Sequence, residues 1–91
     1  MKIIYSNQFK KDLKLAKKRN YNLSHLEQIV NKLVSNEKLD SKYRDHSLTG
    51  NYADFRECHI EPDWLLIYRI ENNELALILF RTGTHSDLFK K

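Results

Sequence analysis

The sequence predicts an α+β fold in which two antiparallel helices pack on one face of an antiparallel sheet, in the order β-α-α-β-β-β. Two observations lead to this fold class. Apolar residues recur at helical spacing in the first third of the chain, and segments of strand-like composition follow one another in the second half. We expect helices over residues 8–19 and 24–34, and strands over residues 1–5, 52–60, 65–71 and 74–81.

The first helix is predicted by Phe9, Leu13 and Ala16, which share one face, while lysines occupy the rest of its circumference. Ser6 or Asn7 is expected to cap it. The second helix carries a longer apolar stripe made of Leu26, Ile29, Val30, Leu33 and Val34. Between this helix and the next strand, residues 36–51 lose all periodicity and are expected to form a long loop.

Three strand candidates follow the loop. Pro62 cannot donate a backbone hydrogen bond and is expected to end the first of them. The pair Asn72-Asn73 suits a tight hairpin turn between the last two. Both alternating sets of residues in those two strands are apolar, so both faces of the sheet should be covered. Because the helices can cover one face only, we expect the Leu88-Phe89 segment or a partner protein on the other.

Composition favours one domain, residues 1–91, of a cytoplasmic protein. The single cysteine excludes an internal disulfide, and no apolar run is long enough for a signal peptide or a membrane span. The net charge is +4, but residues 10–19 alone carry six basic side chains against one acidic and the rest of the chain has a slight acidic excess. Such a patch favours binding to a phosphate backbone, through Lys10, Lys11, Lys14, Lys17 and Lys18. The alternative is a solvated helix face.

Histidines mark the candidate site. His59, Asp63 and Trp64 gather at one strand end, whereas His46 and His85 lie in separate polar segments. A fold that brings these segments together would combine imidazoles, which act as acid or base near neutral pH, with a carboxylate.

Arginine and aromatic residues complete the set. Arg81 ends the last strand four residues before His85 and could hold a phosphate, the chemistry that metal-free RNA cleavage requires. Trp64 and Phe89 could stack on bases. The alternatives are a surface ion pair for Arg81 and a core position for Trp64. A zinc site from His46, His59, His85 and Asp63 lacks the close ligand spacing of such sites, so we expect no metal or other cofactor.

Several motifs carry a family resemblance. They are residues 45–50 (Asp-His-Ser-Leu-Thr-Gly), 58–64 (Cys-His-Ile-Glu-Pro-Asp-Trp), 66–68 (Leu-Ile-Tyr), 81–85 (Arg-Thr-Gly-Thr-His) and 87–89 (Asp-Leu-Phe). Over essentially its full length, the chain resembles the RelE/ParE superfamily of bacterial toxins and, within it, the YafQ family of ribosome-dependent mRNA interferases.

The resemblance implies the activity and partners of the family. The protein would enter the ribosomal A site and cleave mRNA there as a metal-independent endoribonuclease. An antitoxin would silence it, and the protein would reach operator DNA only through that antitoxin. The toxin itself would be a monomer. By resemblance, the catalytic positions of the family are occupied by His46, His59, Asp63, Arg81 and His85. Positions that shape the site are occupied by Trp64 and Phe89. The basic helix would bind ribosomal RNA.

The roles of the histidines follow from the same reasoning. We expect His85, close to Arg81 and the phosphate, to be the general acid. We expect His59 to be the base, and Asp63 either orients His59 or takes the proton itself. His46 would contribute from the loop. Two alternatives belong to other classes: a non-catalytic module of the same fold that binds the ribosome or the antitoxin, and a gyrase-directed toxin. The retained histidines and Arg81 weigh against both.

Overall fold

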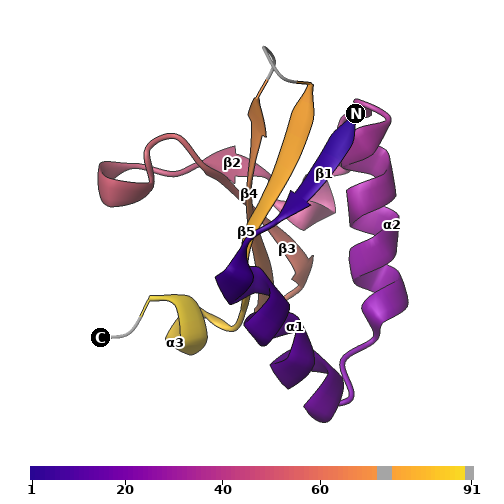
Figure 1. Cartoon of the computed structure of the whole chain (residues 1–91), viewed down its shortest axis with the longest axis vertical. Coiled ribbons are helices and arrows are strands. Elements are labelled where there is room, and N and C mark those ends of the chain that lie inside the picture. Colours follow the sequence, from indigo (N-terminus) through magenta and orange to yellow (C-terminus); the bar gives the residue numbers. More distant parts are fainter. Residues whose placement is uncertain (72–74, 90–91) are drawn as a thin grey trace.

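A computed structural model of the chain describes residues 1–71 and 75–89 (Figure 1). Within these residues, five strands form one sheet in the order β1-β5-β4-β3-β2, and the helices α1 and α2 lie against one face of it. The α+β fold class is confirmed. The elements are β1 (Lys2–Tyr5), α1 (Asn7–Lys18), α2 (Leu23–Val34), the 3-10 turn η1 (Ser41–Tyr43), β2 (His46–Ser47), the 3-10 turn η2 (Gly50–Tyr52), β3 (Arg56–Glu61), β4 (Trp64–Glu71), β5 (Ala76–Gly83) and α3 (His85–Leu88).

The sheet is mixed rather than wholly antiparallel. Strands β3, β4 and β5 form the predicted antiparallel meander, but β1 pairs with β5 in parallel, with Ile3 opposite Leu77. The prediction of an antiparallel sheet is therefore wrong for this edge strand. The chain leaves β1 through both helices and returns to its neighbour only at β5, and a long crossover of this kind permits parallel pairing. The predicted Asn72-Asn73 turn lies outside the described residues.

Helix α1 begins where the sequence predicts. The side chain of Ser6 accepts a hydrogen bond from the backbone N–H of Phe9 at 2.9 Å, which satisfies one of the free donors at the helix start. Phe9 and Ala16 are buried against the sheet. Helix α2 is capped by Asn22 and buries Leu26, Ile29 and Leu33 on the same side. The two helices thus cover one face and leave the other for separate elements.

The second face of the sheet carries its own apolar cluster. Leu65 and Ile67 of β4 lie on it beside Leu88 of α3, with Phe89 partly buried against them. The prediction that the Leu88-Phe89 segment covers this face is confirmed. This arrangement also brings His85, at the start of α3, onto the face opposite the helices.

The segment between α2 and β3 is more ordered than its sequence indicates. It contains two 3-10 turns and the short strand β2, and β3 begins at Arg56 rather than at Tyr52. Asp45 secures it, because its carboxylate accepts hydrogen bonds from the guanidinium of Arg56 and from the hydroxyl of Tyr68. His46 is consequently fixed beside β3, directly opposite Glu57. None of the helices in the described residues is both long and apolar enough to span a membrane.

Candidate active site

A cluster of imidazoles and carboxylates lies on the sheet face opposite α1 and α2. Glu57 and His59 alternate along β3 with Cys58 and Ile60, which belong to the helix-side core. Their partners on β4 are Ile67 and Leu65, both on the second face. The rings of His59 and His85 are 5.7 Å apart, although the two residues come from different elements.

Glu57 lies at the centre of this cluster and is only 5% exposed. One of its carboxylate oxygens, Oε1, is 3.6 Å from Nε2 of His46 and 3.7 Å from Nε2 of His59. Both distances exceed a hydrogen bond but are short enough for strong electrostatic interaction with an imidazolium. One buried carboxylate thus lies between the two imidazoles.

Backbone carbonyls orient both of these histidines. Nδ1–H of His46 donates to the carbonyl of Arg44 at 2.7 Å, and Nδ1–H of His59 donates to the carbonyl of Pro62 at 3.2 Å. Because a carbonyl only accepts, each ring carries its fixed proton on Nδ1, and Nε2 is the nitrogen that gains or loses one. Both Nε2 atoms face the same carboxylate, that of Glu57.

Asp63 binds His85. Its Oδ1 atom accepts hydrogen bonds from the backbone N–H of His85 at 3.3 Å and from Nδ1–H of the same residue at 3.1 Å. These bonds lower the pKa of Asp63 and keep it ionised. The prediction that Asp63 orients His59 is therefore wrong. His59 is turned towards Glu57 and Pro62, because the chain reverses at Pro62 and carries Asp63 past it towards α3.

Helix α3, which carries His85, is secured by a capping box and an ion pair. Thr84 and Asp87 cap each other's backbone N–H groups. Asp87 also pairs with Arg19 at the end of α1, at 2.6 Å, and this partner lowers the pKa of Asp87 to about 2. Gly83 permits the close turn, since a Cβ there would lie 3.0 Å from the side chain of Asp87.

Arg81 is held by a carboxylate of α1. Its Nε and Nη2 atoms donate to Asp12 at 2.8 and 3.2 Å, which raises the pKa of the guanidinium. Asp12 also accepts the backbone N–H of Thr82, at a point on β5 beyond the end of β1. The ion pair left open in the sequence analysis is thus present. The Arg81 side chain remains 23% exposed, and its Nη1 atom makes no hydrogen bond within the described residues.

The two aromatic residues of the predicted site differ in placement. Trp64 is 3% exposed and packs on Tyr21 in the helix-side core, with ring centroids 5.0 Å apart. Its predicted stacking on a base is wrong, because the alternation of β4 turns it away from the site face. Phe89 is partly buried on the site face and meets Tyr52 edge to face. Its position is compatible with the predicted contact.

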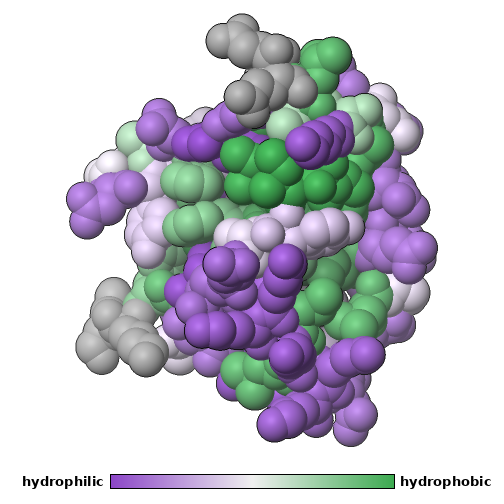
Figure 2. Space-filling view, viewed as in Figure 1, coloured by the Kyte–Doolittle hydropathy of each residue, from purple (hydrophilic) through white to green (hydrophobic). Residues whose placement is uncertain are grey.

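The five lysines of the basic patch (Lys10, Lys11, Lys14, Lys17 and Lys18) are all exposed on α1. Figure 2 shows hydrophilic side chains gathered over α1, beneath an apolar area over β1. The exposed apolar residues include Met1, Tyr5, Leu15 and Leu75. The patch therefore has the exposure that contact with a phosphate backbone requires.

Two groups missed by the sequence analysis complete the site: Glu57 and Asp12. Glu57 had a usable signal, since it precedes His59 by two residues in a predicted strand and so shares its face. Asp12 had none, because its partner Arg81 is 69 residues away. Cys58 is buried, and burial raises the pKa of its thiol, which removes it as a candidate nucleophile.

Glu57, His59 and His85 lie close enough together to hold a metal ion. Each offers one ligand atom, and these atoms lie within 4.8 Å of one another. Imidazole nitrogens with a carboxylate oxygen suit zinc or copper. The same lone pairs are those an acid–base reaction would use, so metal binding and proton transfer at this cluster would compete.

The comparisons with known proteins agree on one family. The family model described as "Bacterial toxin of type II toxin-antitoxin system, YafQ" matches residues 1–90. The curated mRNA interferase toxin YafQ of Escherichia coli K12 is 42% identical over 88 residues, covering 96% of this chain and 94% of the relative. A crystal structure of the E. coli DinJ-YafQ complex has a TM-score of 0.88 at 42% identity and covers 96% of both chains. A metal-bound toxin from Helicobacter pylori has a TM-score of 0.92 at 45% identity, covering 98% of this chain and 99% of that one.

The fold is thus shared with bacterial toxins of known structure. The chain belongs to the YafQ family of toxins of type II toxin-antitoxin systems.

Proposed function

We propose that the protein is an mRNA interferase, an endoribonuclease that cuts mRNA in the ribosomal A site and so inhibits translation. The observation that carries the proposal is the gathering of His46, His59 and His85 with two carboxylates on one sheet face. The E. coli relatives that bear the name mRNA interferase support it.

The proposed reaction is a transesterification without a metal. A base removes the proton of a 2′-hydroxyl, and the 2′-oxygen bonds to the adjacent phosphorus. The bond from phosphorus to the 5′-oxygen breaks, and an acid supplies the proton to that oxygen. The products are a 2′,3′-cyclic phosphate and a 5′-hydroxyl end. Each proton transfer contributes about 10²–10⁴-fold to the rate.

His85 is assigned as the general acid. Nδ1–H of His85 donates a hydrogen bond to Asp63, so Nε2 is the nitrogen that gives its proton to the leaving oxygen. Its ring is 56% exposed, so a substrate can reach it. The phosphate of the bound substrate favours the imidazolium form that an acid requires.

His59 is assigned as the base, with Glu57 in the supporting role that the sequence analysis gave to Asp63. The Pro62 carbonyl fixes the Nδ1 proton, and Nε2 is free to take the proton of the 2′-hydroxyl. Glu57, 3.7 Å from that atom, stabilises the imidazolium that forms. His46 faces the same carboxylate and is assigned a contributing role beside His59.

Arg81 is assigned to the phosphate through Nη1. The other two nitrogen donors are committed to Asp12, which fixes the plane of the guanidinium. A planar cation held in this way needs little reorganisation when charge develops on the phosphorane oxygens. Phe89, at the margin of the same face, is assigned a contact with a base.

The partners follow from surface charge and from the relatives. The lysines of the basic patch would contact ribosomal RNA, and a cognate antitoxin would neutralise the toxin, as DinJ forms a complex with E. coli YafQ. Operator DNA would be reached only through the antitoxin. The toxin alone would be a monomer working in the cytoplasm.

The test is inducible expression with and without the neighbouring antitoxin gene, followed by mapping of mRNA 5′ ends. The proposal predicts cuts in translated frames that disappear on coexpression. Growth arrest without new mRNA ends would instead identify a toxin that acts by binding alone.

A further inference from the structure

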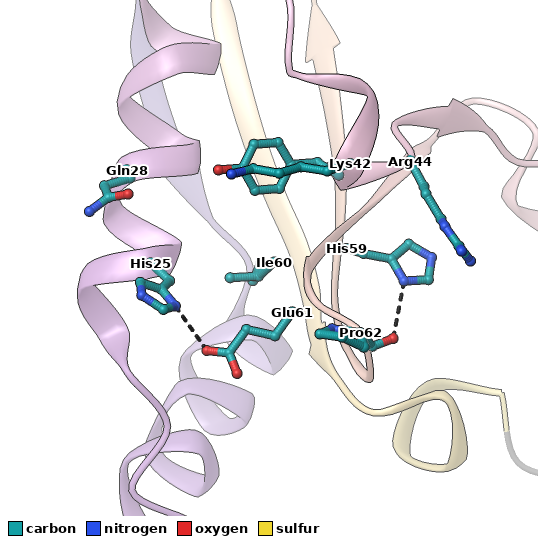
Figure 3. Close-up of a pocket in the computed structure, with 9 residues that line it drawn as sticks. His25, Gln28, Lys42, Arg44, His59, Ile60, Glu61 and Pro62 are labelled. Atoms are coloured by element: carbon teal, nitrogen blue, oxygen red, sulfur yellow. Dashed lines mark hydrogen bonds and ion pairs between the residues drawn. The ribbon is translucent and has the colours of Figure 1, made fainter.

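A groove runs from the catalytic cluster towards α2 (Figure 3). Its volume is about 520 Å³, and His59 forms its boundary with the cluster. From there it passes between η1 and the end of β3 to His25 on α2, as Figure 3 shows. This volume lies within the range of small-ligand sites, roughly 300–1,000 Å³, so the groove has room for a ligand the size of a nucleotide.

The end of the groove next to the cluster is cationic. Lys42 lies in η1, Arg44 directly follows this turn, and both side chains are exposed. Figure 3 shows the Arg44 side chain beside His59. The backbone of Arg44 is tied to the cluster, because its carbonyl accepts a hydrogen bond from Nδ1–H of His46 at 2.7 Å. The Arg44 guanidinium is therefore placed to donate to a phosphate next to the reacting one.

The end of the groove at α2 carries a carboxylate. Nδ1–H of His25 donates to Oε2 of Glu61 at 3.0 Å, which holds the carboxylate at this end. Ile60, which is buried and lies between His25 and His59 in Figure 3, supplies apolar surface between the two ends. A phosphate is repelled by Glu61 and attracted to the cationic end, whereas apolar surface accepts the ring of any base. The groove thus suits a nucleotide without distinguishing its base.

The roles assigned to two histidines determine which nucleotide this is. In an in-line transesterification, the attacking 2′-oxygen and the leaving 5′-oxygen lie on opposite sides of the phosphorus. The base therefore contacts the nucleotide on the 5′ side of the cut, and the acid contacts the nucleotide on the 3′ side. His59, the assigned base, lines the groove, whereas His85, the assigned acid, lies outside it. The groove is accordingly on the 5′ side.

We propose that this groove binds the nucleotide on the 5′ side of the cut, with Arg44 on the phosphate at the 5′ end of that nucleotide. Lys42 adds to the positive charge at the same place. The inference rests on the proposed ribonuclease function and adds the direction in which RNA crosses the site. Beyond the cut, the strand continues past His85 towards Phe89 at the end of α3.

The test titrates three probes into the protein at neutral pH and low salt and follows them by NMR. The first is a dinucleotide whose first ribose lacks the 2′-hydroxyl, so that it cannot be cut. The second carries an added 5′ methyl phosphate and the third an added 3′ methyl phosphate. Both groups are diesters with the same charge, so the third probe is the control for general attraction to a basic protein.

We expect the 5′ methyl phosphate to tighten binding about tenfold more than the 3′ methyl phosphate does, the factor of one hydrogen bond to a charged group. The guanidinium signal of Arg44 should shift with the 5′ probe. Equal tightening by both groups, stronger tightening by the 3′ group, or an Arg44 signal that shifts with none of the probes would overturn the inference.

A variant links this advantage of the 5′ probe to the groove. Arg44→Asn removes the cation, and asparagine tolerates the left-handed backbone of Arg44, whose φ is 50°. We expect it to lose most of the advantage while binding the 3′ probe as wild type does. Lys38→Asn removes the same charge from an exposed position outside the groove and should keep the advantage. The full advantage in Arg44→Asn would overturn the inference.

These titrations do not depend on cleavage, so the inference and the proposed function can fail separately. If wild type cuts mRNA but shows no advantage of the 5′ probe, the inference alone is overturned. If wild type cuts no mRNA, that result counts against the proposed function. If Arg44→Asn weakens antitoxin binding and keeps the full advantage, the groove belongs to the antitoxin and the inference fails.

Discussion

Asp63 and His85 are joined by two hydrogen bonds to a single oxygen atom. Oδ1 accepts the backbone N–H at 3.3 Å and the ring Nδ1–H at 3.1 Å, although the residues are 22 positions apart. The carboxylate therefore fixes both the start of α3 and the ring that projects from it. A histidine held in this way presents Nε2 in one orientation, as an acid–base group requires.

Replacing Asp63 by asparagine tests this orientation. An asparagine amide can turn its NH₂ group towards Nδ1, which would favour the other tautomer. We expect the single-turnover cleavage rate to fall by about 10²-fold or more, with antitoxin binding retained. Ser86→Ala, a neighbouring exposed change that leaves Asp63 in place, is the control. A rate within about twofold of wild type, a difference well below 1 kcal/mol, would remove Asp63 from the mechanism.

Glu57→Gln tests the shared carboxylate. It preserves size but removes the charge that faces Nε2 of His46 and of His59. Loss of that charge disfavours the imidazolium formed when the base takes its proton. We expect the single-turnover cleavage rate to fall while antitoxin binding is retained. An unchanged rate would remove Glu57 from the mechanism.

The Asp87–Arg19 pair makes the attachment of α3 dependent on pH. The folded-state pKa of Asp87, about 2, is below the ordinary value of about 3.9. A lowered pKa stabilises the folded state fully above the unfolded value, and this contribution is lost as pH falls through the folded value. The NMR signal of Leu88 should therefore report a loss of α3 docking between about pH 4 and 2. Asp87→Asn should weaken the docking of α3 already at neutral pH and remove this acid-dependent step, and the same acid transition in both proteins would contradict the assignment.

Charge reversal on α1 tests the basic patch. The double change Lys14→Glu with Lys18→Glu should weaken cosedimentation with ribosomes and make it less dependent on salt. In a plot of log binding constant against log salt concentration, the slope should become shallower by roughly 0.7–0.9 for each phosphate that the patch no longer neutralises. The matched control is Lys2→Glu with Lys38→Glu, which changes the net charge equally at exposed positions outside α1. Equal weakening by both pairs would mean that net charge, and not the patch, governs binding.

Much of the fold could be predicted because it is encoded locally. The helical spacing of Phe9 and Ala16 and the apolar alternation of the later strands each determine an element within a few residues. The parallel pairing of β1 could not be read in this way, since its partner β5 lies at the other end of the chain. Strand β2 has only two residues and shows no periodicity.

The site could be predicted as a set of residues but not as a set of contacts. Sequence proximity placed Asp63 with His59, whereas the fold joins Asp63 to His85. It also placed Arg81 with His85, and the structure adds Asp12 of α1 as the partner of the guanidinium. Such pairings depend on which face each strand presents and on how distant segments meet.

The central claim, that His85 is the general acid of a metal-independent cleavage, is tested most directly by single-turnover cutting of mRNA on programmed ribosomes, with Mg²⁺ present to keep the ribosomes intact and with an excess of a chelator selective for zinc and copper. Wild type should cut at full rate and leave 2′,3′-cyclic phosphate and 5′-hydroxyl ends. His85→Ala should cut slower by at least about 10²-fold while binding ribosomes and antitoxin as wild type does. The account would be contradicted by a His85→Ala protein that cuts at a near wild-type rate, or by wild-type cutting that stops when the zinc- and copper-selective chelator is added.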